Sequence, residues 1–382
     1  MAAGVVIVGG GIGGLTAAIA LRRRGFEPRL YEAAPELREV GAGIGVPPNA
    51  VQVLDRLGLA EAVAAEGQPT RIAELRDARA GLLRRADMSY ATDGRIWPTI
   101  AIHRGRLQRI LAKQLPPASI HTGKQCTGVE LDGDRAIVRF VDGSSTDADL
   151  VIGADGLRSV VRASIVPGAR LRYSGQTSWR GVAKYHLPAE MDAVGWEVWS
   201  AGARVGFSAI GHGEVYWYAT MDAPEGGTDA PGTLAANLAA LAEPFPAPIP
   251  QLIGATEEAR ITRTDLVDLA PIATWHRGRV VLLGDAAHAT TPNLGQGGAQ
   301  AIEDAWVLAD RLAAHQRIEP ALAEYERIRM PKARMVVNLS WRFGKMMHLA
   351  NPIARAARNL LFRAMPERLA RRQYDALYRL NC

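Results

Sequence analysis

Cysteines, long apolar runs and blocks of like charge are all scarce in this chain of 382 residues. The two cysteines, Cys126 and Cys382, form no CxxC pair and no metal-ligand spacing, so we expect no disulfide framework, metal site or dithiol centre. A reducing cytoplasm is the simplest setting for such a protein. No apolar run approaches the roughly 18 residues that a membrane span needs, and the N-terminus lacks the regions of a signal peptide.

Charge and composition are those of an ordinary globular protein. The net charge of +6 comes from 45 basic and 39 acidic side chains, and no Lys/Arg block is interleaved with aromatic residues. We therefore expect no nucleic-acid partner. The length favours two domains, or one large α/β domain that carries an insertion.

The N-terminus predicts a strand–helix–strand unit that binds a dinucleotide. An apolar run at 4–8 leads into residues 9–14, GGGIGG, and then into a helix that stops near Gly25. In this pattern the first glycine permits a tight turn, the second lets the backbone approach a pyrophosphate, and the third lets the helix pack on the strand. The helix start offers N–H groups to the phosphates, and Glu32 would accept hydrogen bonds from a ribose. The cofactor residues expected here are Gly9, Gly11, Gly13, Gly14 and Glu32; the motif alone does not separate NAD from FAD.

Periodicity and turn residues predict the order of the remaining elements. They are a helix from its N-cap Asn49 to about 65, an antiparallel β-meander at 119–152 that ends in a buried strand, an aromatic antiparallel sheet at about 170–222, helical residues 231–255, a buried parallel strand at 279–283, a helix at 296–313, and helices from there to the end.

Two further motifs extend the first. They are residues 149–162, DLVIGADGLRSVVR, and residues 279–288, RVVLLGDAAH, which continue into 292–298, PNLGQGG. With residues 9–14, and in this order, they resemble the FAD-dependent aromatic hydroxylases of the 4-hydroxybenzoate hydroxylase type over nearly the whole chain. The resemblance implies FAD rather than NAD as the bound cofactor. It also implies an α/β fold, in which a Rossmann-like FAD-binding domain carries an inserted antiparallel β-sheet substrate domain and C-terminal helices.

The domain boundaries expected for this fold divide the chain into six segments. The FAD-binding domain would consist of 1–75, 97–171 and 271–340, the substrate domain of 76–96 and 172–270, and the C-terminal helices of 341–382.

The resemblance assigns roles to two aspartates beside glycines. Asp155 and Gly156 would lie near the FAD pyrophosphate and be linked to pyridine-nucleotide use, and Asp285 would hold the ribityl chain. A carboxylate can bridge polyol hydroxyls with charge-assisted hydrogen bonds. Either aspartate taken alone would also suit a turn.

The resemblance places the catalytic loop at Pro292, Gly295, Gln296, Gly297 and Gly298. Pro292 would lie over the flavin ring. The glycine-rich loop leads into a helix, so its N–H groups and the helix dipole could face the negative charge of reduced flavin. A glycine-rich helix start without a ligand is the alternative. We expect His288 to support this loop rather than act as a base.

Other expected cofactor contacts come from three places. Arg104 matches the family's arginine that contacts FAD from a helix start, and Arg106 either shares that task or faces solvent. Arg38 would reach the adenosine side or be exposed. Gly43 and Ile44 resemble the family loop that flanks the isoalloxazine edge.

The expected substrate residues are Arg204, Phe207, Tyr216 and Tyr218. The two tyrosines share one strand face, whereas Arg204 and Phe207 point to opposite faces, so not all four can line a pocket. Arg204 would orient an acidic or carbonyl substrate, or else pair with a carboxylate. Packing is the expected role of Trp179 and Trp217.

The implied reaction uses NADH or NADPH as a transient co-substrate and O2, and it hydroxylates a small aromatic or heteroaromatic compound through a flavin hydroperoxide. The closest resemblance is to hydroxylases of alkyl-quinolones, salicylate, 3-hydroxybenzoate and urate, and few charged pocket candidates favour an alkyl-quinolone. The alternatives are a flavin-binding redox sensor without turnover, and a flavin reductase or halogenase. The halogenase Trp-X-Trp-X-Ile-Pro motif is not matched by residues 196–199, WEVW.

The C-terminal segment mixes arginines with apolar residues. Such a basic amphipathic helix either rests on an anionic membrane or packs across the catalytic domain with its arginines in water, and we favour the packed arrangement. The expected assembly is a monomer or homodimer.

Overall fold

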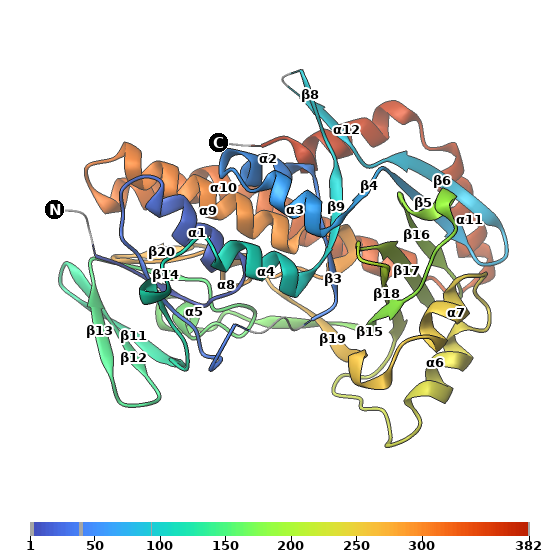
Figure 1. The fold of residues 1–382 in the computed structure, drawn as a ribbon, viewed down its shortest axis with the longest axis horizontal. Coiled ribbons are helices and arrows are strands. Elements are labelled where there is room, and N and C mark those ends of the chain that lie inside the picture. Colours follow the sequence, from blue (N-terminus) through green and yellow to red (C-terminus); the bar gives the residue numbers. More distant parts are fainter. Residues whose placement is uncertain (1–3, 38–40, 93, 381–382) are drawn as a thin grey trace.

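Residues 4–37, 41–92 and 94–380 are described in the computed structural model of the chain. Within them, a largely parallel sheet forms the core of the half that holds the N-terminus (Figure 1). Its six strands are β10 (Ile120–His121), β2 (Arg29–Tyr31), β1 (Val5–Val8), β14 (Leu150–Gly153), β21 (Val280–Leu282) and β20 (His276–Arg277), in that spatial order. Only β20 pairs in the antiparallel sense. The buried strands predicted from the sequence are confirmed.

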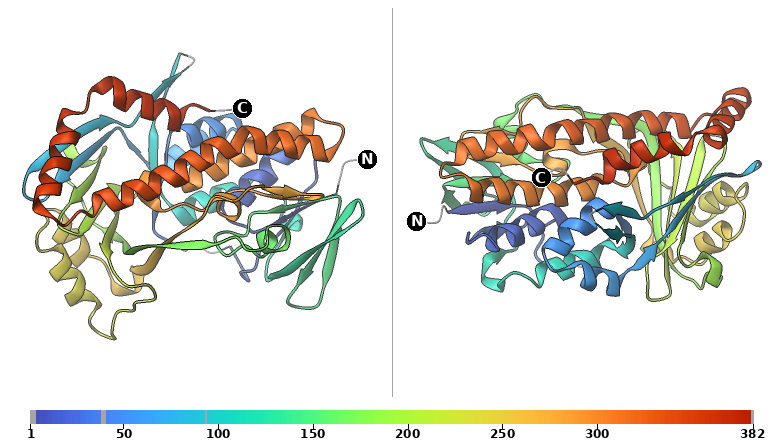
Figure 2. Two further views of the ribbon diagram at one scale, coloured as in Figure 1. Left: turned by 180° about the vertical axis from the view of Figure 1, so that it is seen from behind. Right: turned by 90° about the horizontal axis from the view of Figure 1, so that it is seen from above.

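Three helices pack side by side next to this sheet (Figures 1 and 2): α1 (Ile12–Arg22), α9 (Gly297–Ala314) and α10 (Ile318–Met347). Small residues allow the close approach of α1 and α9. A Cβ added at Gly13 would lie 3.1 Å from the Cβ of Ala301. The shorter helices of this half are α4 (Arg104–Ala112), α5 (Val160–Ile165) and α8 (Asp285–His288).

The helix predicted from Asn49 to about 65 is two helices, α2 (Pro48–Arg56) and α3 (Ala60–Glu66), with Gly58 at φ +63° between them. The prediction of Asn49 as the N-cap is wrong, because Pro47 takes that position. The Asn49 side chain is buried and donates instead to Glu303 on α9, at 2.5 Å.

The predicted β-meander is confirmed as β11 (Cys126–Asp132), β12 (Arg135–Phe140) and β13 (Ser145–Ala148), which pair antiparallel. A small sheet of β3 (Gly43–Val46), β9 (Thr99–His103) and β4 (Gln68–Thr70) joins the two halves of the molecule, and β7 (Tyr90–Thr92) and β8 (Arg95–Trp97) form a separate hairpin. Short 3-10 turns occur at Pro117–Ser119, Ala189–Met191, Glu258–Arg260 and Pro292–Leu294.

The second half is built on a seven-stranded sheet. Its strands are β19 (Thr262–Leu269), β15 (Leu171–Lys184), β18 (Glu214–Asp222), β17 (Ala203–Ala209), β16 (Val194–Trp199), β5 (Ile72–Asp77) and β6 (Gly81–Asp87), in that spatial order. Helices α6 (Leu234–Ala242) and α7 (Ile249–Gly254) share an apolar cluster with one face of it. The predicted inserted antiparallel sheet is confirmed, although β5 pairs with β16 in parallel. The domain boundaries stay a prediction.

The C-terminus is helical, as predicted. After α10 the chain turns into α11 (Pro352–Ala364) and then α12 (Glu367–Tyr378), which returns across the molecule toward α2 (Figure 2). The Gln52 side chain donates to the Tyr378 carbonyl at 3.2 Å and holds this end in place.

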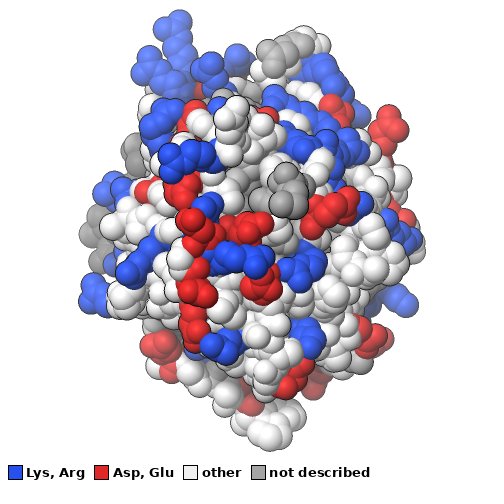
Figure 3. Space-filling view, turned by 90° about the vertical axis from the view of Figure 1, so that its left-hand side faces the viewer, with Lys and Arg blue, Asp and Glu red and all other residues white. Residues whose placement is uncertain are grey.

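The surface carries mixed charge. On the face in Figure 3, Lys and Arg side chains are interspersed with Asp and Glu side chains. Among the described residues, no helix is long and apolar enough to cross a membrane.

Candidate functional site

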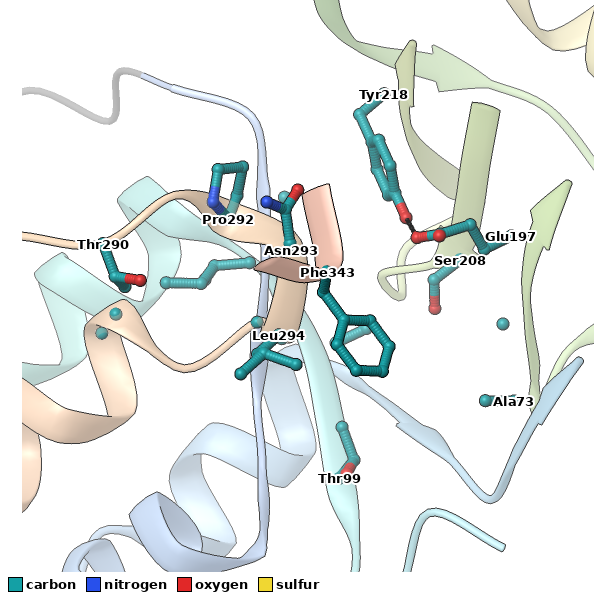
Figure 4. A pocket seen from close by; sticks show the side chains of 18 of the residues that line it. Ala73, Thr99, Glu197, Ser208, Tyr218, Thr290, Pro292, Asn293, Leu294 and Phe343 are labelled. Atoms are coloured by element: carbon teal, nitrogen blue, oxygen red, sulfur yellow. Dashed lines mark hydrogen bonds between the residues drawn. The ribbon is translucent and has the colours of Figure 1, made fainter. Parts of the chain in front are cut away.

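A cavity of about 900 Å³ lies between the two halves of the molecule. The loops that follow β1, β14 and β21 border it on one side, and the seven-stranded sheet borders it on the other. In α/β sheets, ligands bind at the carboxyl ends of the parallel strands, and these loops lie at those ends. Figure 4 shows Pro292, Asn293 and Leu294 on the first side and Glu197, Ser208 and Tyr218 on the second.

The loop after β1 opens the first part of the cavity. Gly9 has φ +111°, and a Cβ added at Gly14 would lie 2.0 Å from the Gly9 carbonyl oxygen, so both positions require glycine. A Cβ at Gly11 would meet nothing within 4 Å. Gly11 is also the N-cap of α1 and supplies no side-chain cap, which leaves the first N–H groups of the helix available to an anion.

Glu32 fixes the far side of this loop. One of its carboxylate oxygens accepts from the Gly10 N–H at 2.6 Å, and the other accepts from the Ala34 N–H at 2.8 Å. Carboxylate oxygens can accept further hydrogen bonds, so the predicted ribose contact is compatible with these two. The predicted contact of Arg38 lies outside the described residues.

The two residues of the second motif face different ways. The Asp155 carboxylate accepts from the Ser159 hydroxyl at 2.5 Å and from the N–H groups of Val160 and Val161 at 2.7 and 3.1 Å. It therefore holds the start of α5, which is the turn-forming role that the sequence left open. Gly156, at φ +77°, lines the cavity. Gly156 is thus placed for a cofactor contact, while the Asp155 contact stays a prediction.

Asp285 and Arg104 both line the cavity. The Asp285 side chain is exposed, lines the cavity, and has no hydrogen bond or ion pair with any described residue. Desolvation by the surrounding protein raises the pKa of Asp285, and the charges of His288 and Arg104 oppose the rise. A carboxylate that lines a cavity without a protein partner can accept hydrogen bonds from a ligand that carries hydroxyl groups.

The predicted catalytic loop borders the cavity through its backbone. Gly295 takes the left-handed conformation at φ +62°, and α9 then starts at Gly297 with no side-chain cap. A Cβ at Gly298 would lie 3.0 Å from the Cδ1 of Ile44, so Ile44 lies against the helix start; Gly43 and Ile44, which the resemblance placed in a loop, belong to strand β3. The first N–H groups of this 18-residue helix therefore face the cavity together with its positive dipole end.

The Gln296 side chain points away from the cavity. It is 1% exposed, and its amide oxygen accepts from Asn49 at 3.1 Å and from Gln300 at 2.9 Å. Glu303, two turns farther along α9 than Gln296, accepts from Asn49, Arg329 and Lys332. The side chain of Gln296 thus positions the loop, and its predicted catalytic role rests on its backbone alone.

His288 takes the supporting role that the sequence favoured. It is 5% exposed, its Nε2 lies 2.5 Å from an Asp304 carboxylate oxygen, and its ring packs on Trp275. Burial acts to raise the pKa of Asp304, but His288 and Arg329 outweigh burial and lower this pKa to about 2. Asp304 also accepts from the Gly284 N–H at 2.9 Å, which fixes the turn before Asp285.

Two tyrosines form the wall opposite the catalytic loop. Tyr216 and Tyr218 share one face of β18, and their ring centroids are 6.0 Å apart. Each tyrosine ring packs directly against a glycine, where a larger residue would clash with it. A Cβ at Gly43 would lie 2.3 Å from the ring of Tyr216, and one at Gly206 would lie 2.4 Å from Tyr218. Substitution of either glycine would displace a tyrosine of the cavity wall.

Arg204 pairs with a carboxylate, which is one of the two alternatives left by the sequence. It is 1% exposed, its Nη1 lies 3.3 Å from Glu197, its Nε donates to the Thr220 hydroxyl at 2.9 Å, and its Nη2 donates to Asn293. Tyr218 also donates to Glu197. Burial acts to raise the pKa of Glu197, but Arg204 and these hydrogen bonds keep it below its usual range.

Phe207 borders the cavity, yet it belongs mainly to the apolar cluster on the other face of the sheet. That cluster also contains Trp179 and Trp217, whose N–H groups bond Asp229 and Thr256. The expected packing role of both tryptophans is confirmed. All four predicted substrate residues touch the cavity. Arg204 and Phe207 lie on opposite faces of β17, and Phe207 packs mainly in the cluster on the far face, so it forms less of the cavity wall.

These residues fit FAD. Two uncapped helix starts, of α1 and α9, face one cavity, which suits the two anionic parts of the cofactor, the pyrophosphate and the reduced ring. Between them lie the open space at Gly11 and the unpartnered carboxylate of Asp285.

Comparison with known proteins identifies the family of this chain. A sequence profile described as an FAD binding domain matches residues 2–340. The chain belongs to this family of FAD-dependent monooxygenases. It is 43% identical over 361 residues to the aurachin C monooxygenase/isomerase of Stigmatella aurantiaca, with 94% of each chain covered. It is 35% identical over 381 residues to the 2-heptyl-3-hydroxy-4(1H)-quinolone synthase of Pseudomonas aeruginosa, covering 98% of this chain and 97% of that protein.

Solved structures agree with this membership. Klebsiella pneumoniae HpxO, solved with FAD and uric acid, superimposes with a TM-score of 0.87 at 31% identity, over 98% of this chain and 96% of that one. The predicted fold, the FAD cofactor and an activity as a flavin monooxygenase of aromatic or heteroaromatic compounds are thus confirmed.

Sequence reasoning missed several residues of this monooxygenase's cavity. Glu197, which neutralises Arg204, and Asn293, which accepts a hydrogen bond from it, were not predicted. An acidic residue inside the aromatic strand WEVW could have indicated a buried ion pair. Phe343 projects into the cavity from α10 (Figure 4), and helical periodicity alone gave no reason to choose it. Arg180 on β15 also lines the cavity, without a hydrogen bond or ion pair to any described residue. Arg106 lies elsewhere, since it bonds Glu214 at 3.0 Å.

Proposed function

We propose that this monooxygenase hydroxylates a neutral, largely apolar heteroaromatic ring of the 4-quinolone type. The observation that carries the proposal is the pairing of Arg204. Its charge is neutralised by Glu197, and its Nε, Nη1 and Nη2 atoms each donate to protein groups, so it is poorly placed to anchor a substrate carboxylate. The relative named 2-heptyl-3-hydroxy-4(1H)-quinolone synthase supports the same substrate class.

Apart from Arg180, the remaining wall suits a flat, uncharged ring. Leu294, Phe343 and Tyr216 present apolar or aromatic surface, and the polar groups of Asn293 are bonded within the protein. Aromatic walls favour a planar ligand by stacking. The guanidinium of Arg180 remains as a donor for a ring carbonyl oxygen.

Each part of the site has a distinct task in the proposed reaction. When bound, FAD supplies the redox chemistry, accepting hydride from a nicotinamide and activating O2. The N–H groups at the start of α1 would hold the phosphates, and Asp285 would accept from the ribityl hydroxyls. The N–H groups at the start of α9, at Gly297 and Gly298, would stabilise negative charge on the ring. Pro292 and Phe343, which line the cavity, would exclude water from the ring site.

A substrate panel tests this proposal. Purified enzyme with FAD is offered 2-methyl-4-quinolone, salicylate and urate, and NADH and NADPH are compared as donors. The expected result is that the quinolone accelerates flavin reduction and gains one oxygen by mass, whereas the two anions do neither. Preferential hydroxylation of salicylate or urate would overturn the proposal. Absence of substrate-dependent NAD(P)H oxidation with every compound would favour the redox-sensor alternative.

Helix α11 packs against β6, which is the arrangement that the sequence analysis favoured. For the outer face of α11 we propose the alternative that the sequence also left open, a contact with an anionic membrane surface. Ile353, Leu360 and Leu361 are 81%, 67% and 58% exposed and form one stripe, while Arg358 and Phe362 pack the opposite face against the protein. The segment 351–382 has seven arginines and two acidic residues, a side-chain charge of +5 (7 − 2). An exposed apolar stripe with basic neighbours fits anionic lipid, and like charge disfavours a second copy of the helix.

Liposome co-sedimentation tests the membrane contact. Wild type should bind vesicles that contain phosphatidylglycerol at low salt and should not bind neutral vesicles, and L360E should bind neither. Equal behaviour of wild type and L360E would contradict the contact. A cytoplasmic location and a monomeric or homodimeric assembly remain part of the proposal.

A further inference from the structure

The cavity extends beyond the ring site, between a β-ribbon and the C-terminal helices. Strand β5 lines it with Ala73, Glu74 and Leu75, strand β6 lines it with Arg84 and Ala86, and Ala73 pairs with Ala86 across the ribbon. Met88 continues the same wall, and Met365, between α11 and α12, and Tyr374 of α12 line it as well. We call this part, lined by Ala73, Leu75, Ala86, Met88, Met365, Ala370 and Tyr374, the distal chamber.

Phe343 marks the boundary between the ring site and the distal chamber. In Figure 4 its ring projects between Leu294 and the strand that carries Ala73. It packs in one apolar cluster with Leu75 and Met365. A ligand that stacks beside Phe343 can therefore continue into the distal chamber without leaving apolar surroundings.

The walls of the distal chamber are held in place by buried contacts. Asn359 and Arg358 of α11 both bond Asp77 at the end of β5, at 3.0 and 3.5 Å. Burial acts to raise the pKa of Asp77, but its hydrogen bonds lower this pKa to about 2. Asp77 is therefore ionised at neutral pH and keeps its contacts with Arg358 and Asn359. These contacts hold α11 against the ribbon of β5 and β6 and so fix one wall of the distal chamber.

The charged residues on this wall are already paired. Arg84 donates to the Met365 carbonyl at 2.9 Å, and Glu74 bonds Arg76 at 2.5 Å. What remains for a ligand is chiefly methyl, methylene, thioether and aromatic surface. Such a lining binds an aliphatic chain more favourably than water or a polar substituent.

We infer that the substrate ring carries an aliphatic tail, and that the distal chamber binds this tail. The inference rests on the proposed function, because the ring must lie beside Phe343 for its tail to enter. It assigns to the C-terminal helices a role in selecting substrates by chain length. A tail-free ring such as a purine or a simple phenol would leave the chamber unfilled.

The test is a series of 2-alkyl-4-quinolones with methyl to nonyl tails. Each buried methylene should improve kcat/KM by about fourfold until the chamber is full, so the heptyl compound should exceed the methyl compound by at least tenfold. Ala86→Phe and Ala73→Phe should remove most of this gain and leave the methyl compound within twofold of wild type. Ala356→Phe, on the exposed face of α11, is the matched control and should behave as wild type.

A binding assay separates the chamber from the reaction. Displacement of the fluorescent probe N-phenyl-1-naphthylamine by n-alcohols needs no turnover, and longer alcohols should displace it from wild type at least tenfold better than from Ala86→Phe. A flat chain-length profile, with the methyl compound still hydroxylated, would overturn the inference and leave the proposed function standing. Chain-length-dependent alcohol binding without hydroxylation of any quinolone would support the chamber and overturn the proposed function.

Discussion

Substitution of two glycines in the same loop should separate cofactor binding from folding. Gly11 has φ −73° and ψ −178°, which an alanine adopts without strain, and its added Cβ would meet no protein atom within 4 Å. The cost to the apoprotein is that of an alanine at an N-cap, about 0.5–1 kcal/mol of unfolding free energy. The same methyl group would fill the space where the pyrophosphate approaches the backbone. Gly11→Ala should therefore weaken FAD binding by at least about tenfold, or about 1.4 kcal/mol.

Gly14→Ala should behave in the opposite way. Its Cβ would lie 2.0 Å from the Gly9 carbonyl oxygen, and backbone must move to relieve the clash. Overpacking of this kind costs about 1–3 kcal/mol, more than the roughly 1 kcal/mol that alanine returns as a helix former. The apoprotein should unfold at lower urea concentration than wild type. The assays are urea unfolding of the apoprotein and titration of FAD by the quenching of its fluorescence. Wild-type FAD affinity in Gly11→Ala would refute the placement of the pyrophosphate.

Three further perturbations address the substrate half. Glu197→Gln leaves the buried charge of Arg204 without its counterion, so thermal and urea unfolding should show a loss of about 3–5 kcal/mol, and a change below 1 kcal/mol would contradict the pairing. Arg180→Met should lower kcat/KM for a quinolone about tenfold with little change in FAD affinity, as expected for a lost hydrogen bond from a charged donor, and an unchanged kcat/KM would argue against a substrate contact. Burial, assisted by Arg204, lowers the pKa of His348 from 6.5 to about 4, so the folded state resists protonation. The unfolding free energy should be constant above about pH 6.5 and fall by about 1.4 kcal/mol per pH unit as the pH drops toward 4, and His348→Gln should flatten this slope in urea titrations.

The cofactor half could be predicted from the sequence because its constraints are local. Gly9 and Gly14 are required by the contact of one backbone segment with another, and the buried strands read as continuous apolar runs. The order of strands, meander and inserted sheet followed from the same patterns. Motif matching also pointed to Asp285 and Gly297, which both line the cavity.

Long-range contacts set the limits of prediction. Asn49 has the right chemistry for a helix cap, but its side chain is drawn into a buried network with Glu303, 254 positions away. The Asp155 carboxylate likewise accepts a hydrogen bond from the Val160 N–H at the start of α5. The pairing of Arg204 depends on a neighbouring strand and on Asn293, and the distal chamber depends on how α11 packs against β6 and α12 packs against α10 and α2. None of these contacts has a periodic or motif signature within one stretch of sequence.

The most direct test of the whole account is a crystal structure of the protein with FAD. The account predicts that the pyrimidine edge of the isoalloxazine ring lies within hydrogen-bonding distance of the N–H groups at Gly297 and Gly298, with the ribityl chain on Asp285. A ring bound away from the start of α9, or a ribityl chain that does not touch Asp285, would contradict it.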